Sequence, residues 1–193
     1  MTNIFNLSVN KNIIPQIWKL SKIIPILKPS KDPNDSTSYR PISLLSPLIK
    51  TLEKVLLTLI SNEIPNTEHQ HGFKKKHSTS TALHNITDTI IKGFNDKRPP
   101  KRTILVSLDM SKAFDNVALH ILINKLHKTN LNKTLIKFIY NYIKGRKGYV
   151  IFDNVKSHKL NFKSGVPQGG VLSPTLFNIY MSDLPSPPLN VEL

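Results

Sequence analysis

Several residue types are missing or scarce in this chain of 193 residues. It contains no cysteine, which excludes disulfide bonds and thiolate metal sites. Acidic residues are few, because 12 Asp and Glu stand against 27 Lys and Arg and leave a formal net charge of +15. No apolar run approaches the length that spans a bilayer. The first residues also lack a basic stretch followed by an apolar one, so we predict an intracellular protein with no membrane partner.

The composition that is present favours a folded, basic protein. Hydrophobic residues make up 39% of the chain, enough for one domain or for one domain with two lobes. A strong positive field attracts polyphosphates, and binding releases their counterions. A solvated, lysine-rich surface is the alternative reading, and composition alone does not decide between the two.

Periodicity and turn residues predict a mixture of helices and strands. We expect helices to begin at Ser46-Pro47, at Ser78 or Thr79 and at Ser173-Pro174, and to cover 118–128 and 131–143. We expect strands at 103–108, 149–152 and 158–162, the last two as a hairpin. Elements in this order predict an α/β (α+β) sheet covered by helices.

Asp109 ends the first expected strand, within the string Leu-Asp-Met-Ser-Lys-Ala-Phe-Asp at 108–115. A carboxylate at the end of a strand can hold Mg²⁺, which prefers hard oxygen ligands, and the carbonyl of Met110 could add another ligand. Two such ions can activate a 3′-hydroxyl and stabilise a leaving pyrophosphate. For an isolated Asp, the capping of a turn would be the preferred interpretation.

A second string, Gly-Val-Pro-Gln-Gly-Gly-Val-Leu-Ser-Pro, occupies 165–174. Its glycines allow the backbone to turn or to approach a substrate without a Cβ clash. Gln168 carries both donors and an acceptor, so it can contact base, sugar or phosphate groups. The alternative is a plain Gly/Pro turn before a capped helix.

The two strings together resemble two of the three signature blocks of reverse transcriptases, especially those of non-LTR, Jockey-like retrotransposons. The resemblance covers the chain from about 13 to 185. It implies a partial right-hand polymerase without a thumb: 1–102 mainly fingers, and 103–193 an incomplete palm with an interleaved helical segment at 118–148. It also implies an RNA template, a DNA primer, dNTP and Mg²⁺ as partners and cofactor of the intact enzyme.

The resemblance further implies a role for single residues. Asp109 would be the catalytic metal ligand, with Met110 beside it. Phe114 would lie under the sugar of the incoming nucleotide and select dNTP over rNTP, although ordinary core packing is an alternative. Gln168 would contact the incoming nucleotide, and Asp115 would make a structural hydrogen bond.

Two upstream segments resemble the same family. Residues 24–29 and 38–45 are similar to its fingers region, where Arg40 would grip the triphosphate together with Lys28 or Lys31. Residues 70–83 are similar to a block of the non-LTR group. There Lys74, Lys75 and Lys76 would bind the template backbone, with a solvated loop as the alternative.

The third signature block, an aromatic-X-Asp-Asp hairpin, does not occur before Leu193. With one carboxylate ligand, two Mg²⁺ ions would not be held in register, so we expect these residues to be inactive alone. A basic nucleic-acid-binding remnant without catalysis and a truncated gene product without activity are the alternatives. A group II intron maturase is the second choice of lineage, but the His-Gly-Phe…His-Ser-Thr block argues against it. The oligomeric state stays open.

Overall fold

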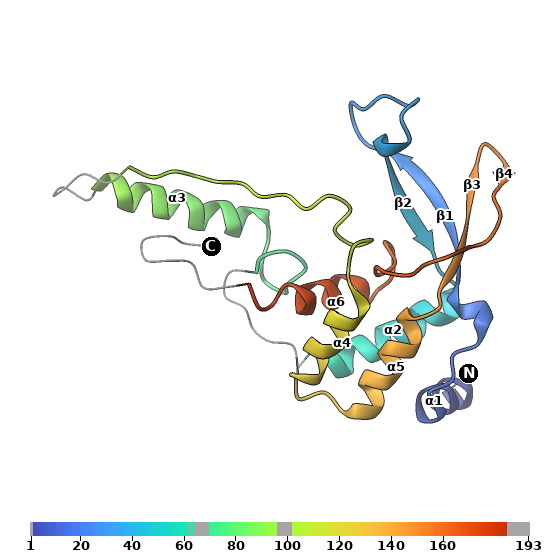
Figure 1. Cartoon of the computed structure of the whole chain (residues 1–193). Helices are drawn as coiled ribbons and strands as arrows, with labels where there is room; N and C mark the ends of the chain where they lie inside the picture. Colours follow the sequence, from blue (N-terminus) through green and yellow to red (C-terminus); the bar gives the residue numbers. More distant parts are fainter. Residues whose placement is uncertain (1, 62, 64–69, 96–101, 185–193) are drawn as a thin grey trace. The chain divides into compact units, whose positions relative to one another are not determined.

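The computed structural model describes residues 2–61, 63, 70–95 and 102–184. The chain divides into two compact units, one of residues 1–65 with 112–182 and the other of residues 66–111 with 183–193. The contacts between residues define these units, whereas the expected fingers and palm portions stay a prediction. Figure 1 shows the elements in chain order.

The first unit holds most of the secondary structure. Its helices are α1 (Thr2–Lys11), α2 (Pro47–Ile60), α4 (Leu119–His127), α5 (Lys133–Ile143) and α6 (Ser173–Tyr180), with short 3-10 turns at Gln16–Lys19 and Ser36–Ser38. Its strands are β1 (Leu20–Leu27), β2 (Tyr39–Leu44), β3 (Lys147–Phe152), β4 (Val155–Lys156) and β5 (Leu160–Asn161). The described part of the second unit contains α3 (Thr79–Asn95). The predicted mixture of helices and strands is confirmed.

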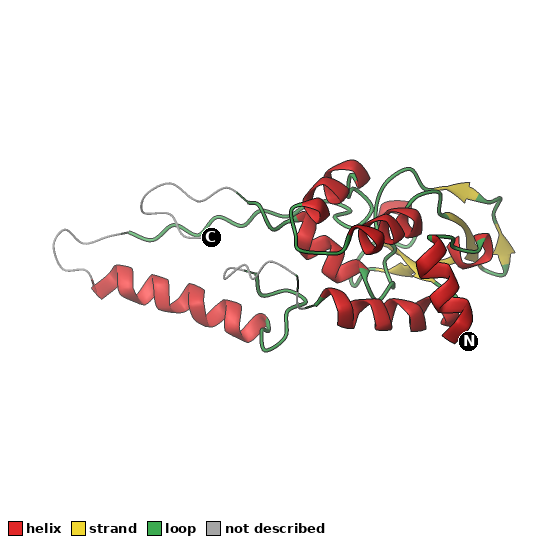
Figure 2. Cartoon of the chain, turned by 90° about the horizontal axis from the view of Figure 1, so that it is seen from below, coloured by secondary structure: helices red, strands yellow, loops and turns green. Residues whose placement is uncertain are grey.

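A mixed sheet in the order β2-β1-β3-β4 lies beside the helices of the first unit, and β5 also pairs with β3 (Figure 2). β1 runs antiparallel to β2, with Ile26 opposite Arg40, and parallel to β3. Because side chains alternate along a strand, Ile26 and Arg40 share one face of the sheet. Ile23 and Ser43, also opposite each other, share the other face and are both buried.

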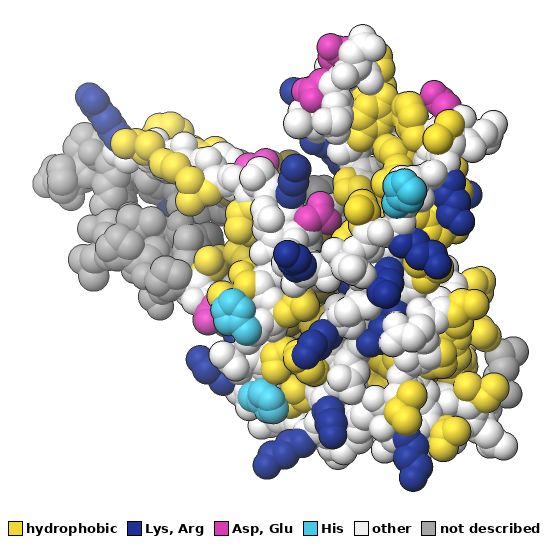
Figure 3. All heavy atoms as spheres, turned by 45° about the vertical axis from the view of Figure 1, so that its right-hand side comes forward, with side chains coloured by type: hydrophobic (Ala, Val, Ile, Leu, Met, Phe, Trp, Pro, Cys, Tyr) yellow, Lys and Arg dark blue, Asp and Glu magenta, His cyan; other side chains and the backbone are white. Residues whose placement is uncertain are grey.

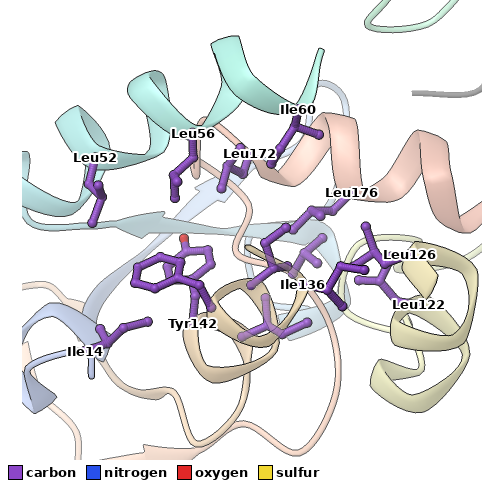
Figure 4. Close-up of a cluster of buried hydrophobic side chains, with 14 of the residues drawn as sticks. Ile14, Leu52, Leu56, Ile60, Leu122, Leu126, Ile136, Tyr142, Leu172 and Leu176 are labelled. Carbon is purple, nitrogen blue, oxygen red and sulfur yellow. The ribbon is translucent and has the colours of Figure 1, made fainter. Parts of the chain in front are cut away.

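The helices of the first unit enclose an apolar core. Figure 4 shows its side chains directed toward one another from α2, α4, α5 and α6. Its labelled members are Ile14, Leu52, Leu56, Ile60, Leu122, Leu126, Ile136, Tyr142, Leu172 and Leu176. The spacing of Leu52, Leu56 and Ile60 is that of one helix face, which is why α2 packs here. Val166 and Leu172, from the chain after β5, belong to this core, so the core anchors that part of the chain.

Helix starts were predicted well, with one correction. Ser46 precedes α2 and Pro47 is its first residue, as expected. Ser78 and Thr81 exchange side-chain and backbone hydrogen bonds at the start of α3, at 3.3 and 2.9 Å, which identifies Ser78 as the cap. The last helix, α6, begins at Ser173 as predicted, but Ser173 does not cap it as Ser46 precedes α2. Leu172, already in the helical conformation, takes the capping position, and Ser173 is the first helical residue.

The strand predicted at 103–108 is absent, because residues 102–110 form neither helix nor strand. Ile104, Val106 and Leu108 are 84, 72 and 92% exposed. A strand exists only with a hydrogen-bonding partner, and none of the strands in the described ranges pairs with this segment. The alternation of apolar residues therefore indicates a local preference for an extended chain, but this segment forms no strand in the described structure.

The predicted hairpin is present but turns earlier than expected. β3 contains the expected first strand, and Phe152 pairs with Val155 across the two-residue turn Asp153-Asn154. Both turn residues have positive φ, 46° and 64°, which suits the twist of a tight hairpin. The returning chain is divided into β4 and β5 instead of one strand at 158–162.

None of the helices in the described ranges is long and apolar enough to cross a membrane.

Candidate functional site: the glutamine loop

The loop at 165–170, here called the glutamine loop, lies between β5 and α6 and is held by backbone hydrogen bonds on two sides. The amide of Val166 donates to the carbonyl of Phe114 at 2.9 Å. The amide of Gly165 donates to the carbonyl of Val117 at 2.8 Å. From the sheet, the amide of Ser43 donates to the carbonyl of Gln168 at 2.6 Å. The loop is thus fixed between β2 and the turn that follows Lys112.

Two glycines of the loop are required by its conformation and its contacts. Gly169 has φ +114°, and a Cβ there would lie 2.6 Å from the carbonyl oxygen of Ser43. Gly165 has φ +82°, and a Cβ there would lie 2.7 Å from the carbonyl oxygen of Asp115. Both values of φ are ones that side-chain-bearing residues rarely adopt. The sequence predicted that these glycines let the backbone turn or approach a substrate. In the structure, what they approach is the protein's own backbone.

The side chain of Gln168 is oriented by the other signature string. Its Nε2 donates to Oδ2 of Asp115 at 3.1 Å, and Ser164 Oγ donates to the carbonyl of Asp115 at 3.1 Å. Asp115 therefore makes the structural hydrogen bond that we predicted. With its amide nitrogen held in this way, Gln168 stays half-exposed at the surface of the first unit.

Phe114 lies at the edge of the core. Its half-buried ring stacks on the ring of Phe177 in α6, with centroids 5.0 Å apart and an interplanar angle of 14°. This contact confirms packing against the core, which was the alternative interpretation of the residue. A role in sugar discrimination stays a prediction, because a half-buried ring can still present one edge to a ligand.

Sequence reasoning missed Glu53, a fully buried carboxylate that supports the loop from below. Tyr142 OH donates to its Oε1, and the amide of Val171, just after the loop, donates to its Oε2 at 2.9 Å. Burial raises the pKa of Glu53, and the hydrogen bonds from Tyr142 and Val171 act against that rise. The sequence does contain a signal of its burial, because Glu53 shares the apolar face of α2 with Leu52 and Leu56.

Arg146, which follows α5, is a second buried charged residue that contacts the glutamine loop. Its side chain is only 5% exposed. Its Nη2 donates to the carbonyl of Gly165 at 2.8 Å, its Nε donates to the carbonyl of Ile143 at 3.3 Å, and its Cζ lies 5.4 Å from the ring centre of Phe162. Burial lowers the pKa of Arg146, while the nearby acidic groups of Tyr142, Asp115 and Glu53 oppose the shift.

The residues expected to bind triphosphate lie on and beside the β1–β2 hairpin. Arg40 is exposed on β2, opposite Ile26. Strand alternation, continued one residue past β1, puts Lys28 on the same face, and its Nζ donates to the carbonyl of Thr37 at 2.9 Å. Lys31 is exposed in the loop that follows. The structure thus brings Lys28 and Arg40 to one face, and their binding role stays a prediction.

The remaining predicted site residues belong to the second unit. Asp109 and Met110 are exposed in the segment without regular structure. Lys74 is half-buried, and Lys75 and Lys76 are exposed in the turns before α3. Asp109 and Gln168 belong to different units, and the predicted roles of the two side chains at one catalytic site stay predictions.

The described residues do not by themselves make a two-ion site. Nowhere in the described ranges do three or more His, Asp or Glu side chains gather in a way that could hold a metal ion. Of the two carboxylates in the first string, Asp115 accepts the hydrogen bond of Gln168, which leaves Asp109 as the one candidate ligand there. A single carboxylate does not satisfy the several oxygen ligands that Mg²⁺ requires.

Comparison with known proteins places both strings in one family. Residues 26–191 match the family described as reverse transcriptase (RNA-dependent DNA polymerase). This chain belongs to the reverse transcriptase family. Divalent metal ions are general to polymerases of this family.

Individual relatives narrow the type of reverse transcriptase. The chain is 34% identical over 188 residues to the probable RNA-directed DNA polymerase from transposon BS of Drosophila melanogaster, covering 95% of this chain and 20% of the relative. It is 36% identical over 187 residues to the RNA-directed DNA polymerase from mobile element jockey of Drosophila funebris, with the same coverage. The predicted Jockey-like, non-LTR lineage is confirmed. The chain spans about a fifth of the length of these relatives.

Proposed function

We propose that this reverse transcriptase segment forms the fingers and part of the palm of a polymerase that extends a DNA primer on an RNA template. In the whole protein, Asp109 with the carbonyl of Met110 would hold Mg²⁺, which when bound would activate the primer 3′-hydroxyl. Arg40 and Lys28 would neutralise the triphosphate, Phe114 would limit the space at the sugar, and Gln168 would contact the nascent pair.

The observation that carries this proposal is the support of Gln168. Its carbonyl is held by β2, its amide nitrogen by Asp115, and the residues after it by the buried carboxylate of Glu53. A glutamine at an ordinary surface turn would lose side-chain entropy when it binds a ligand. A side chain already oriented by its neighbours loses less, which is the benefit of a preorganised binding site.

The distribution of charge supports a nucleic-acid partner. Figure 3 shows Lys and Arg side chains spread over the face of the molecule that it displays, with fewer acidic side chains between them. With a formal net charge of +15, the chain gains free energy by releasing counterions from a polyanion. Lys74, Lys75 and Lys76, next to the start of α3, are our candidates for contacts with the template backbone.

For these 193 residues alone we propose binding without turnover. The described residues contribute one carboxylate ligand, and two Mg²⁺ ions need several. The test is fluorescence anisotropy with a labelled RNA–DNA primer–template, followed by addition of Mg²⁺ and the next dNTP. We expect binding that weakens steeply with salt, tightening by dNTP, and no primer extension. Gln168→Ala should abolish the tightening and preserve binding of the duplex.

Each alternative predicts a different result in the same assay. Binding that is insensitive to dNTP would favour a nucleic-acid-binding remnant and contradict the proposed role of Gln168. Primer extension that disappears in Asp109→Ala would show that the chain is active alone and contradict the proposed lack of turnover. Absence of any nucleic-acid binding would contradict the whole proposal.

A further inference from the structure

A pocket of about 450 Å³ opens in the first unit behind the glutamine loop. Its walls are mainly apolar and include Ile23 of β1, Val150 of β3 and the ring of Phe162. Polar side chains also line it, among them Asp115, Arg146 and Gln168. A cavity of this size, with apolar walls and a few placed polar groups, is typical of small-ligand sites.

The pocket lies on the opposite face of the sheet from the proposed triphosphate clamp. Its strand residues Ile23 and Ser43 are opposite each other in the β1–β2 register, as Ile26 and Arg40 are on the other face. Because alternate residues of a strand point to opposite faces, the side chain of Arg40 points away from the pocket. The pocket is therefore a site separate from the one that Arg40 and Lys28 would form.

Hydrogen-bonding capacity remains at the pocket. A guanidinium has five N–H groups that can donate hydrogen bonds. Among the described residues, Arg146 donates to the carbonyls of Ile143 and Gly165. Oδ2 of Asp115 accepts a hydrogen bond from Gln168, whereas its Oδ1 accepts none from the described residues. Arg146, only 5% exposed, is thus a buried donor with unused N–H groups at the pocket wall.

The charges at the pocket select the kind of ligand. Asp115 offsets the positive charge of Arg146 and favours its charged form, so the interior is close to neutral and does not single out an anion. Lys163, by contrast, lies exposed at the rim. A flat, neutral group with both donors and acceptors suits the interior, and a phosphate suits the rim. A nucleotide unit of a nucleic-acid strand combines the two.

We propose that this pocket binds one unstacked nucleobase of a bound strand, with guanine as the best fit. Guanine presents the acceptors O6 and N7, which match a guanidinium, and carries N–H donors at its pairing edge that match the carboxylate of Asp115. Phe162 offers a ring against which a base can stack. The proposal rests on the nucleic-acid-binding function proposed above and adds to it a base-binding pocket that shares Gln168 with the proposed nascent-pair contact.

The test is calorimetric titration of the whole chain with guanosine, 7-deazaguanosine and inorganic phosphate. We expect guanosine to bind, 7-deazaguanosine to bind about tenfold more weakly because it lacks N7, and phosphate not to compete. Val150→Trp should fill the pocket and abolish guanosine binding. Val155→Trp is the matched control, since Val155 is 71% exposed on β4 and is not part of the pocket wall.

Three results would overturn this inference: no binding of guanosine, competition by phosphate, or equal binding by Val150→Trp and Val155→Trp. The anisotropy assay of the primer–template separates this failure from failure of the proposed function. If the duplex binds and guanosine does not, the nucleobase pocket is wrong and the proposed function stands. If neither binds, both are wrong.

Discussion

The side-chain amide of Gln168 donates a hydrogen bond to the carboxylate of Asp115, 3.1 Å away and 53 residues earlier in the chain. This bond joins the two sequence strings that identify the family. It lies among backbone hydrogen bonds that connect the same two segments, from Gly165 to Val117 and from Val166 to Phe114. The first string therefore orients the functional side chain of the second.

Replacement of Asp115 should loosen this connection. We expect Asp115→Asn to lower the free energy of unfolding by about 1 kcal/mol, because a charged acceptor is exchanged for a neutral one. Urea denaturation measures the change. Asp153→Asn is the matched control, since Asp153 is exposed in the β3–β4 turn with φ 46°, where Asn is well tolerated. An equal loss in both variants would contradict a specific role for Asp115.

Gly169 should tolerate no side chain. In Gly169→Ala the new Cβ would meet the carbonyl oxygen of Ser43 at a φ of +114°, so steric repulsion adds to backbone strain. Gly145→Ala is the control, because its φ is +68° and no atom lies within 4 Å of the new Cβ. We expect Gly145→Ala to cost about 1 kcal/mol and Gly169→Ala clearly more, as read from thermal unfolding. A smaller effect at Gly169 would show that the loop can move away from β2.

Glu53 should make stability depend on pH in an unusual direction. Burial raises its pKa in the folded protein above the ordinary value of 4.5, so the unfolded chain loses this proton first as the pH rises. The carboxyl group therefore makes folding less favourable as the pH rises from 4.5 toward the raised pKa. Urea unfolding between pH 4 and pH 7 should show wild-type stability falling relative to Glu53→Gln. Two parallel profiles would contradict the raised pKa.

Lys74, Lys75 and Lys76 should contribute to the salt dependence of nucleic-acid binding. Changing all three to Ala should reduce the slope of log K against log salt by about 2 to 3, because each neutralised phosphate contributes close to one unit. The control changes Lys11, Lys128 and Lys137, which are exposed on or beside helices of the first unit. Equal slopes in the two triple variants would show that only net charge matters.

The helices were predictable because their signals are local. The start of α2 is marked by Ser46-Pro47, and its apolar face repeats with helical spacing. α5 begins after Asn132, whose side chain accepts a hydrogen bond from the amide of Thr134. Such interactions join residues a few positions apart, so they are visible in a single sequence.

The strands were less predictable because each depends on a partner distant in the sequence. Residues 103–108 alternate as a strand would, yet no described strand pairs with them. β1, in contrast, pairs in parallel with β3, more than a hundred residues later. The turn Asp153-Asn154 was visible in principle, since both residue types tolerate positive φ.

By itself, the sequence determined the family, the mixed fold, the candidate residues Asp109 and Gln168 and the structural role of Asp115. Only the tertiary structure showed that Glu53 and Arg146 are buried beneath the glutamine loop, and that Arg40 and the pocket lie on opposite faces of one sheet. The physical reason is that burial and strand register arise from contacts between distant segments. In the sequence alone, a basic residue that becomes buried, such as Arg146, looks the same as one that stays on the surface.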